Sequence, residues 1–422
     1  MTFGDLLPEI VVPPPGPRSR ELSAALEAFE APGVNTVSGG QPSILWEEAR
    51  GANVRDVDGN TYIDLTSGFG VAAIGHRHPR VVEAVREQAG RLLHALGDVM
   101  AHPLRVELAR RLAAIAPVDE PQVFFAISGA EAVEIALKTA LSVTGKPGIL
   151  AFHPSYHGLT LGALNVTSRP EFRDPFADHL HGHVRRLPFA GDLARVEELL
   201  ASGWIGSVIV EPIVGREGVL IPPDGWLAGL AELCRSHGAL LIADEIFTGF
   251  GRLGTLFAVE AEGVRPDLLC CGKALGGGLP IAAVIARRDH FSSWETVGEA
   301  RHTATFLANP LACAAALATL DVLEEEGLAA RAVRLGEQLG QRLSRWPDRF
   351  PNVEEVRGRG LLWGVQFRTA ETAKRWMLGA WSQGILLLAG GPEGRVGQLV
   401  PPLTIRKEQL EGAAGILEEL LA

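Results

Sequence analysis

The chain has 422 residues, of which 47% are hydrophobic and 21% charged, values typical of a soluble globular protein. Its formal net charge of -11 argues against a nucleic-acid or acidic-membrane partner. No basic stretch precedes the first apolar residues, and no apolar run reaches the roughly 20 residues of a spanning helix, so we expect neither a signal peptide nor a membrane anchor. The four cysteines lie in apolar segments without metal-ligand spacing, which favours reduced thiols and a cytoplasmic location.

The first part of the chain predicts one helix and one β-hairpin. Residues 19–29 have an amphipathic pattern, and two alternating runs flank Asp58-Gly59, a dipeptide typical of hairpin turns. His76 and His78 follow in a loop before a helix predicted over residues 81–93. Because no third ligand is near in the sequence, we interpret both histidines as hydrogen-bonding loop residues and expect no metal site.

From residue 100 onward, short apolar strands alternate with helices, a pattern typical of a parallel sheet with crossover helices. The predicted strands cover 122–126, 148–152, 184–187, 207–210, 240–243, 268–271 and 280–286, and the predicted helices cover 130–144, 225–237 and 309–326. After residue 326, strands at 353–356, 361–367 and 385–388 mix with helices at 370–383 and 407–421. We therefore expect an α/β protein with a large domain over 66–326, a smaller α+β domain over 327–422, and an N-terminal segment, 1–65, that packs with the small domain.

Two buried strands bring an acid and an amine to neighbouring positions. Asp244 closes the apolar run 240–243, and Lys273 follows the apolar run 268–271. Open α/β sheets bind ligands at the carboxyl ends of their strands, so both side chains should face one crevice. Of the five lysines, Lys273 alone lies between apolar strand residues and glycines, and desolvation makes a lysine amine neutral and nucleophilic more readily. The alternative is an ordinary surface lysine whose charge stays in water.

Other polar groups follow strands of the same sheet. The run Ser128-Gly-Ala-Glu131 stands between a strand and a helix, where exposed N–H groups can bind a phosphate, although its first and last residues could equally form a capping box. Tyr156 could stack on a planar ring, although a lone aromatic residue in a loop is more often simply packed. Glu211 ends another strand, and Thr305 in a polar loop is a further candidate phosphate donor.

Together these residues provide what pyridoxal 5'-phosphate (PLP) requires of a protein. Its phosphate binds at a helix N-terminus, its ring against an aromatic side chain, its pyridine nitrogen against a carboxylate, and its aldehyde on a lysine. A carboxylate keeps the ring nitrogen protonated, so the ring can accept the electrons released when a bond to the substrate's α-carbon breaks. The sequence therefore predicts a PLP enzyme with Lys273 and Asp244 at its centre.

Six separated motifs resemble the signatures of the class III aminotransferases, the ornithine and 4-aminobutyrate group of fold type I. They are Ser128-Gly-Ala-Glu-Ala132, Tyr156-His-Gly158, Glu211-Pro212, Ala243-Asp-Glu-Ile-Phe-Thr-Gly-Phe-Gly-Arg252, Gly272-Lys273 and Asn309-Pro-Leu-Ala-Cys313, in the order of the family. The resemblance implies a large domain with a mostly parallel seven-stranded sheet and a homodimer with a shared active site. It also implies transfer of an amino group from an amino acid or amine donor to a keto acid or aldehyde acceptor.

For catalysis, the resemblance implies Lys273 as the Schiff-base lysine and proton shuttle, Asp244 at the pyridine nitrogen, and Glu211 close to the Schiff base. The further residues that it implies for cofactor binding are Ser128, Gly129 and Ala130 at the phosphate, Tyr156 over the ring, and Thr305 from the partner subunit of the dimer.

Three positions that face the substrate depart from the family pattern. Phe247 stands where the family often has a glutamine, Gln398 where many members have a carboxylate-binding arginine, and Arg216 where the ornithine and 4-aminobutyrate enzymes have a glutamate. We hypothesise that Arg216, or Arg395 nearby in the C-terminal loop, binds the substrate carboxylate, because a glutamine gives only a weaker neutral contact. Alternatively, Arg216 is a solvated loop residue, and the substrate is an amine without a nearby carboxylate.

Two other kinds of function are compatible with the sequence. The same scaffold supports PLP-dependent amino-acid racemases, epimerases and decarboxylases, and Glu217 could provide the second base that racemisation needs. A non-catalytic α/β binding protein is the other alternative, but the intact pair of Asp244 and Lys273 argues against it.

Overall fold

The computed structural model describes residues 2–34, 43–295 and 298–422, and its largest sheet has seven strands in the order β4-β10-β9-β8-β7-β5-β6. In this sheet β10 runs antiparallel to β4 and β9, and the other neighbours are parallel. The predicted α/β fold with a mostly parallel sheet is thereby confirmed. The strands are β4 (Pro121–Ala126), β5 (Gly148–His153), β6 (Val184–Pro188), β7 (Ile205–Val210), β8 (Leu240–Asp244), β9 (Leu268–Cys271) and β10 (Ala282–Arg287).

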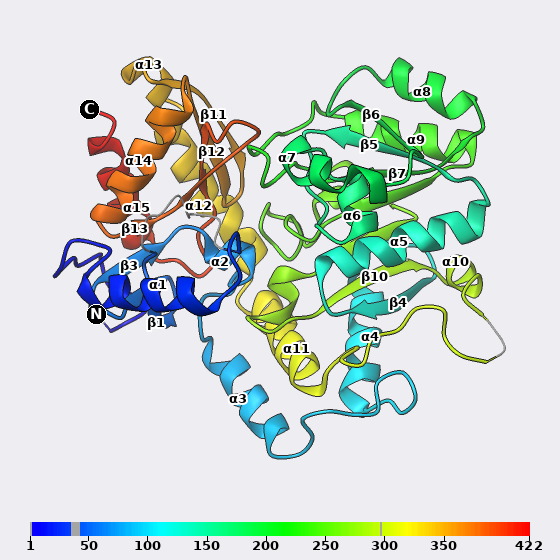
Figure 1. Ribbon diagram of the computed structural model, residues 1–422, viewed down its shortest axis with the longest axis horizontal. Helices are drawn as coiled ribbons and strands as arrows, with labels where there is room; N and C mark the ends of the chain where they lie inside the picture. The colour runs from blue at the N-terminus through cyan, green and yellow to red at the C-terminus, as the bar shows by residue number, and fades with distance from the viewer. Residues whose placement is uncertain (1, 35–42, 296–297) are drawn as a thin grey trace.

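Helices cover both faces of this sheet, which explains why its strands are continuous apolar runs. Successive residues of a strand point to opposite faces. Ile242 therefore packs in the cluster beneath α5 (Gly129–Thr144), whereas Leu241 and Ala243 pack in the cluster that contains Leu227 and Leu230 of α9. The helices around the sheet, on the right in Figure 1, also include α4 (Pro103–Ile115), α6 (Leu161–Val166), α7 (Pro170–Arg173), α8 (Leu193–Ala201), α9 (Trp226–His237) and α10 (Arg288–Ser292).

Two four-stranded sheets lie on the other side of the molecule, where Figure 1 shows both chain termini. One contains β1 (Trp46–Arg50), β2 (Asn53–Asp56), β3 (Thr61–Asp64) and β13 (Ile385–Leu386), and the other contains β11 (Val353–Arg359), β12 (Leu362–Phe367), β15 (Val396–Leu399) and β14 (Leu388–Gly390). The accompanying helices are α1 (Pro17–Phe29), α12 (Leu328–Leu343), α13 (Trp346–Arg349), α14 (Ala370–Ser382) and α15 (Lys407–Glu419).

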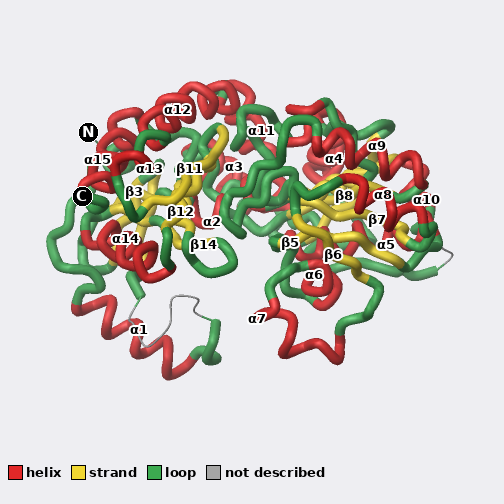
Figure 2. The backbone as a smooth tube through the Cα atoms, turned by 90° about the horizontal axis from the view of Figure 1, so that it is seen from above, coloured by secondary structure: helices red, strands yellow, loops and turns green. Residues whose placement is uncertain are grey.

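The first and last parts of the chain share one of these sheets, because β13 pairs in parallel with β3, with Ile385 opposite Ile63. Seen from above, in Figure 2, the small sheets and the seven-stranded sheet lie side by side. Helix α11 (Pro310–Glu325) packs against α3 (Pro79–Ala89), and it begins as expected, with Asn309 as N-cap and proline in the first turn. The remaining helix, α2 (Ser67–Gly70), is a short turn. The division of the chain at residues 65 and 326 stays a prediction.

Some predicted elements differ in extent from the observed ones. The helix predicted over 81–93 ends at Ala89, where Gly90 caps it. The strand predicted over 385–388 is two short strands, because the chain leaves β13 at Leu387, whose carbonyl accepts a hydrogen bond from Trp381. The hairpin at Asp58-Gly59 is confirmed, with Val54 of β2 opposite Tyr62 of β3. Within the described ranges, no helix is long and apolar enough to cross a membrane.

Candidate active site

The ends of β7, β8 and β9 bring Glu211, Asp244 and Lys273 into one crevice. Lys273 follows β9 after Gly272, and its backbone has a positive φ of 41°. Loss of hydration lowers the pKa of its amine to about 8, although the carboxylates of Asp244 and Glu211 act in the opposite direction. Its Nζ atom lies 4.3 Å from the centre of the Phe247 ring, so an apolar surface replaces water on one side of the amine.

The carboxylate of Asp244 is held by a residue that sequence reasoning missed. Asp244 is only 4% exposed, and its Oδ2 atom lies 2.7 Å from Nδ1 of His157. Since an ionised carboxylate only accepts hydrogen bonds, Nδ1 carries the proton of this bond. The backbone N–H of His157 donates to Thr167 Oγ1 at 2.9 Å, which fixes the loop. The signal that could have identified His157 is its place in the motif between Tyr156 and Gly158.

Glu211 ties two loops of the crevice together. Its Oε1 atom accepts a hydrogen bond from the backbone N–H of Tyr156 at 2.9 Å, and its Oε2 atom accepts one from Gly215 at 3.1 Å. Burial raises the pKa of Glu211 to about 7, with His157 opposing this shift. Glu211 therefore titrates close to neutral pH while it holds the loop of Tyr156 beside the loop of Arg216.

The N-terminus of α5 offers two N–H groups to the crevice. Ser128 is the N-cap and accepts from the N–H of Glu131, whose own carboxylate reaches the N–H of Ile127 rather than that of Ser128. Within the described part of the chain, the N–H groups of Gly129 and Ala130 find no acceptor. The capping interaction and a free anion-binding helix end are therefore present together.

Gly158 brings the loop of Tyr156 against this helix end. Its φ is +124°, and a Cβ atom at this position would lie 2.7 Å from the Cβ atom of Ala130. Only glycine allows this approach without a displacement of one of the two segments. The loop and the start of α5 thus form two adjacent walls of the crevice.

Arg216 presents its guanidinium group to two aromatic rings of the crevice. Its Cζ atom lies 4.2 Å from the centre of the Tyr156 ring and 5.3 Å from that of Phe172. Its side chain forms no ion pair with any residue that the structure describes. The amide of Gln398 holds the backbone of the loop, because Nε2 donates to the carbonyls of Gly215 and Arg216, both at 2.9 Å.

The other candidates from the sequence are engaged elsewhere. Arg395 is paired with Glu393 at 2.9 Å and with Glu354 at 3.6 Å. The carboxylate of Glu217 is buried and accepts a hydrogen bond from Arg169 Nε at 2.7 Å.

Thr305 is exposed, and among the described residues it forms no hydrogen bond with the groups of the crevice. His76 contacts Asp64 at 2.8 Å, whereas His78 faces Glu326 at 3.4 Å, so the two histidines have different partners. No group of three or more possible metal ligands occurs in the described ranges.

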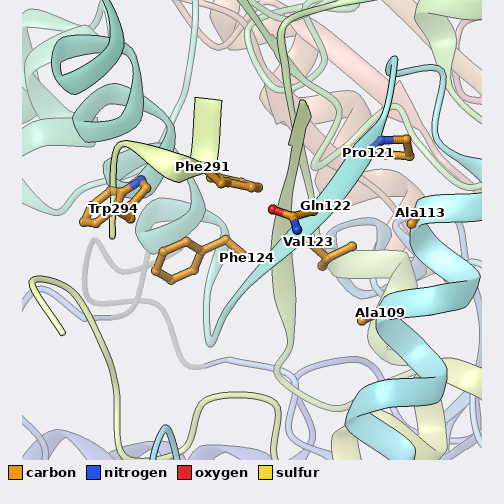
Figure 3. A pocket seen from close by; sticks show the side chains of 8 residues that line it. All are labelled: Ala109, Ala113, Pro121, Gln122, Val123, Phe124, Phe291 and Trp294. Carbon is orange, nitrogen blue, oxygen red and sulfur yellow. The ribbon is translucent and has the colours of Figure 1, made fainter. Parts of the chain in front are cut away.

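A cavity at the edge of the large sheet carries no comparable chemistry. It has a volume of about 440 Å³ and lies between β4, the edge strand of the large sheet, and helices α4 and α10 (Figure 3). Its lining includes Ala109, Val123, Phe124, Phe291 and Trp294, and none of its lining residues is titratable. The crevice at the ends of β7, β8 and β9 is therefore the better candidate for catalysis.

Comparisons with known proteins agree with this geometry. Residues 35–421 match the family Aminotransferase class-III. The chain is 44% identical to the acetylornithine aminotransferase of Methanopyrus kandleri, over 88% of this chain and 92% of the relative. It is 39% identical to that of Methanothermobacter thermautotrophicus, over 90% of this chain and 94% of the relative.

Among solved structures, the ornithine aminotransferase of Toxoplasma gondii is similar, with a TM-score of 0.88 and 32% identity over 96% of this chain and 94% of that chain. A PLP-bound amine transaminase from an uncultivated Pseudomonas species has a TM-score of 0.86 and 28% identity, over 93% of this chain and 98% of that chain. The chain therefore belongs to the class III aminotransferases, PLP-dependent enzymes of fold type I that move an amino group from an amino acid or amine donor to a keto acid or aldehyde acceptor.

Proposed function

We propose that Lys273, Asp244 and Glu211 are the catalytic residues of this aminotransferase. The observation that carries the proposal is an amine with a pKa lowered to about 8, held beside two buried carboxyl groups at the ends of adjacent strands. The donor set fits PLP, because the free N–H groups of Gly129 and Ala130 suit its phosphate, the Asp244 carboxylate suits its ring nitrogen, and the Lys273 amine suits its aldehyde. When bound, PLP supplies an electrophilic carbonyl carbon and a ring that stabilises negative charge at the carbon that bears the transferred amino group.

Lys273 moves the proton in each half-reaction. In the donor half-reaction, the neutral amine would take a proton from the reacting carbon of the donor and pass it to the bound cofactor. In the acceptor half-reaction the transfer would run in reverse, so that the ammonium delivers a proton to the reacting carbon of the acceptor. At neutral pH, a lysine with a pKa of about 8 has a larger neutral fraction than an exposed lysine. Burial of the amine therefore supports a proton-transfer role for Lys273.

Asp244 holds a proton at the ring nitrogen, and His157 positions Asp244. The hydrogen bond from His157 Nδ1 fixes the orientation of the carboxylate without neutralising it. Tyr156, whose backbone is anchored by Glu211, would provide an aromatic surface for the ring of the cofactor. The loop backbone and the catalytic carboxylates thus form one connected network.

The proposed donor is an amino acid whose carboxylate binds Arg216. Arg216 is the candidate with a free guanidinium among the described residues, whereas the side chain of Arg395 is already paired with two carboxylates. Gln398 acts on the substrate mainly by positioning Arg216, because its amide nitrogen already donates hydrogen bonds to the carbonyls of Gly215 and Arg216. Since the curated relatives are acetylornithine aminotransferases, N-acetylornithine is the first donor to test.

We also propose that the enzyme is a homodimer in which Thr305 serves the active site of the partner. An exposed apolar surface supports this proposal, since monomeric proteins rarely leave such residues together in water. Beside Thr305, Phe306 is 59% exposed, and its ring centre lies 5.3 Å from that of His94. The neighbouring residues Leu93, Leu96, Val99 and Met100 are between 57% and 69% exposed.

The domain division at residues 65 and 326 and the cytoplasmic location are further proposals. The pairing of β3 with β13 supports an N-terminal segment that packs with the small domain. The four buried free cysteines support a reducing compartment.

A donor panel tests the proposed substrate class. PLP-loaded enzyme should convert N-acetylornithine with 2-oxoglutarate or pyruvate as acceptor, with one glutamate or alanine formed for each donor consumed. It should convert the corresponding amine that lacks the carboxylate at least tenfold less efficiently in kcat/KM. Equal efficiency with both donors would remove the carboxylate site from the proposal.

A further inference from the structure

A cluster of positively charged side chains lies close to Phe172, one of the two aromatic residues that contact Arg216. A cavity of about 200 Å³ is lined by residues of α6, of α7, of β6 and of the segment between α7 and β6, among them Arg173, His181 and Arg186. Arg173 follows Phe172 directly in α7, so neighbouring residues of this short helix serve the crevice and the cavity. Neither the catalytic residues nor the Arg216 loop line this cavity.

The two arginines lack a counter-charge. Among the described residues, neither Arg173 nor Arg186 forms an ion pair, and the Nε atoms of both are buried without a hydrogen-bond partner. Arg186 donates one hydrogen bond, from NH2 to the carbonyl of Asn165. Loss of hydration, together with the positive charge of Arg173, lowers the pKa of Arg186 to about 10. Both side chains are half-buried, and an anion between them would offset the repulsion of the two like charges and give the buried Nε donors an acceptor.

The neighbouring carboxylates do not balance this charge. Asp174 lines the cavity but is exposed and forms no ion pair in the described ranges. Glu134, whose charge acts on His181, is hydrogen-bonded to Thr160 Oγ1 at 2.7 Å and to the N–H of Gly162 at 2.8 Å. Since the whole chain has a net charge of -11, attraction of an anion would come from this local cluster.

We propose that this cavity binds a small tetrahedral oxyanion, either inorganic phosphate or the phosphate group of a monoester, between Arg173 and Arg186. Guanidinium groups match the oxygens of phosphate with pairs of charge-assisted hydrogen bonds. The volume of about 200 Å³ is several times the share of one water molecule, about 30 Å³ in the liquid, but smaller than the roughly 300–1,000 Å³ of sites that enclose drug-sized ligands. The cavity therefore fits a phosphate group with a few waters rather than a whole nucleotide.

Calorimetric titration of the PLP-loaded enzyme tests this site, because bound PLP already fills the phosphate site at the start of α5. The readout is binding and not turnover, so the outcome is independent of the proposed substrate. We expect saturable binding of inorganic phosphate with one site per chain, weakened at least tenfold by Arg186→Gln and by Arg173→Gln. The matched control is Arg185→Gln, since this neighbouring guanidinium lies 4.9 Å from the centre of the Trp204 ring, and the control should bind as wild type does. If one of the two variants does not fold, the other carries the test.

Two further arms make the test specific. Arg216→Ala should keep the phosphate affinity, because the proposed site does not include the crevice. Glycerol 3-phosphate in place of phosphate distinguishes a monoester from the free ion as the ligand, and saturable binding of either supports the site. Absence of saturable binding to wild type, equal affinity in the Arg173, Arg185 and Arg186 variants, or loss of binding in Arg216→Ala would overturn the proposal.

Discussion

The Nδ1 atom of His157 lies 2.7 Å from the Oδ2 atom of Asp244, and both side chains are at most 4% exposed. A buried carboxylate needs hydrogen-bond partners to stay ionised, and this histidine is its side-chain partner. The second oxygen of Asp244 accepts a hydrogen bond from the N–H of Ile246 at 3.2 Å. The orientation of Asp244 thus depends on a residue from a loop 87 positions away in the sequence.

Replacement of His157 tests this dependence. His157→Ala leaves Asp244 with one fewer donor, and the loss of a hydrogen bond to a buried charged group costs about 1–3 kcal/mol. If this cost falls on the transition state, kcat decreases about 5- to 150-fold. His157→Asn, whose amide can donate to the same carboxylate, should recover part of kcat. Steady-state kinetics with saturating PLP measures both variants, and equal kcat in wild type and His157→Ala would contradict the positioning role.

The pH dependence of PLP uptake reports on the amine of Lys273. Burial lowers its pKa to about 8 from the ordinary value of 10.5, and only the neutral amine attacks an aldehyde. The uptake rate of the apoenzyme should therefore rise about tenfold per pH unit below pH 8 and level off above it. Stopped-flow absorbance measures this rate. A midpoint near 10.5 would show that the amine is not desolvated.

Glu211 should influence the same titration in a defined direction. Its negative charge raises the pKa of Lys273, because it stabilises the ammonium form. Glu211→Gln removes this charge, so the midpoint of the uptake profile should move to lower pH. Glu232→Gln, at an exposed position of α9, is the control and should leave the midpoint in place. A shift to higher pH in Glu211→Gln would contradict the assigned electrostatics.

Arg216→Ala tests the carboxylate site. Loss of a charge-assisted contact costs about 1.5–3 kcal/mol, so the KM of a carboxylate-bearing donor should rise about 10- to 150-fold. The decarboxylated donor should be affected much less. Because the charge of Arg216 also lowers the pKa of Lys273, the kinetics should be measured well above pH 8. Arg395→Ala is the matched control, and an equal rise for both donors in Arg216→Ala would exclude carboxylate binding.

Gln398 should act through the same loop. Gln398→Ala removes two hydrogen bonds to the carbonyls of Gly215 and Arg216, and we expect KM for the carboxylate donor to rise about 3- to 10-fold with little change in kcat. In the Arg216→Ala background, the same substitution should add almost nothing, because the group it positions is absent. Fully additive effects in the double variant would show that Gln398 contacts the substrate independently.

Local sequence patterns predicted the strand ends that carry the crevice. The apolar runs before Asp244 and Lys273 are continuous because both faces of the sheet are covered, and the polar residue after each run marked the strand end. The antiparallel direction of β10 was not predicted, although only residues 272–281 separate it from β9, too few for a crossover helix.

Contacts between distant segments could not be predicted in this way. Hydrophobic periodicity reports that a segment is buried but not which segment lies against it. Three observed contacts join distant parts of the chain. They are the hydrogen bond between His157 and Asp244, the hydrogen bond from Gln398 to the Arg216 loop, and the pairing of β13 with β3. The choice between Arg216 and Arg395 likewise needed the structure, because only their surroundings reveal which of the two is already paired.

Reduction of the PLP-loaded enzyme with borohydride tests the central assignment most directly. The reagent fixes PLP to the amine that holds it, and peptide mass spectrometry then identifies the modified lysine among the five in the chain. The structure predicts a single modified peptide that contains Lys273, and none in Lys273→Ala. Modification of another lysine in the wild-type enzyme, or of none, would contradict the assignment of the active site.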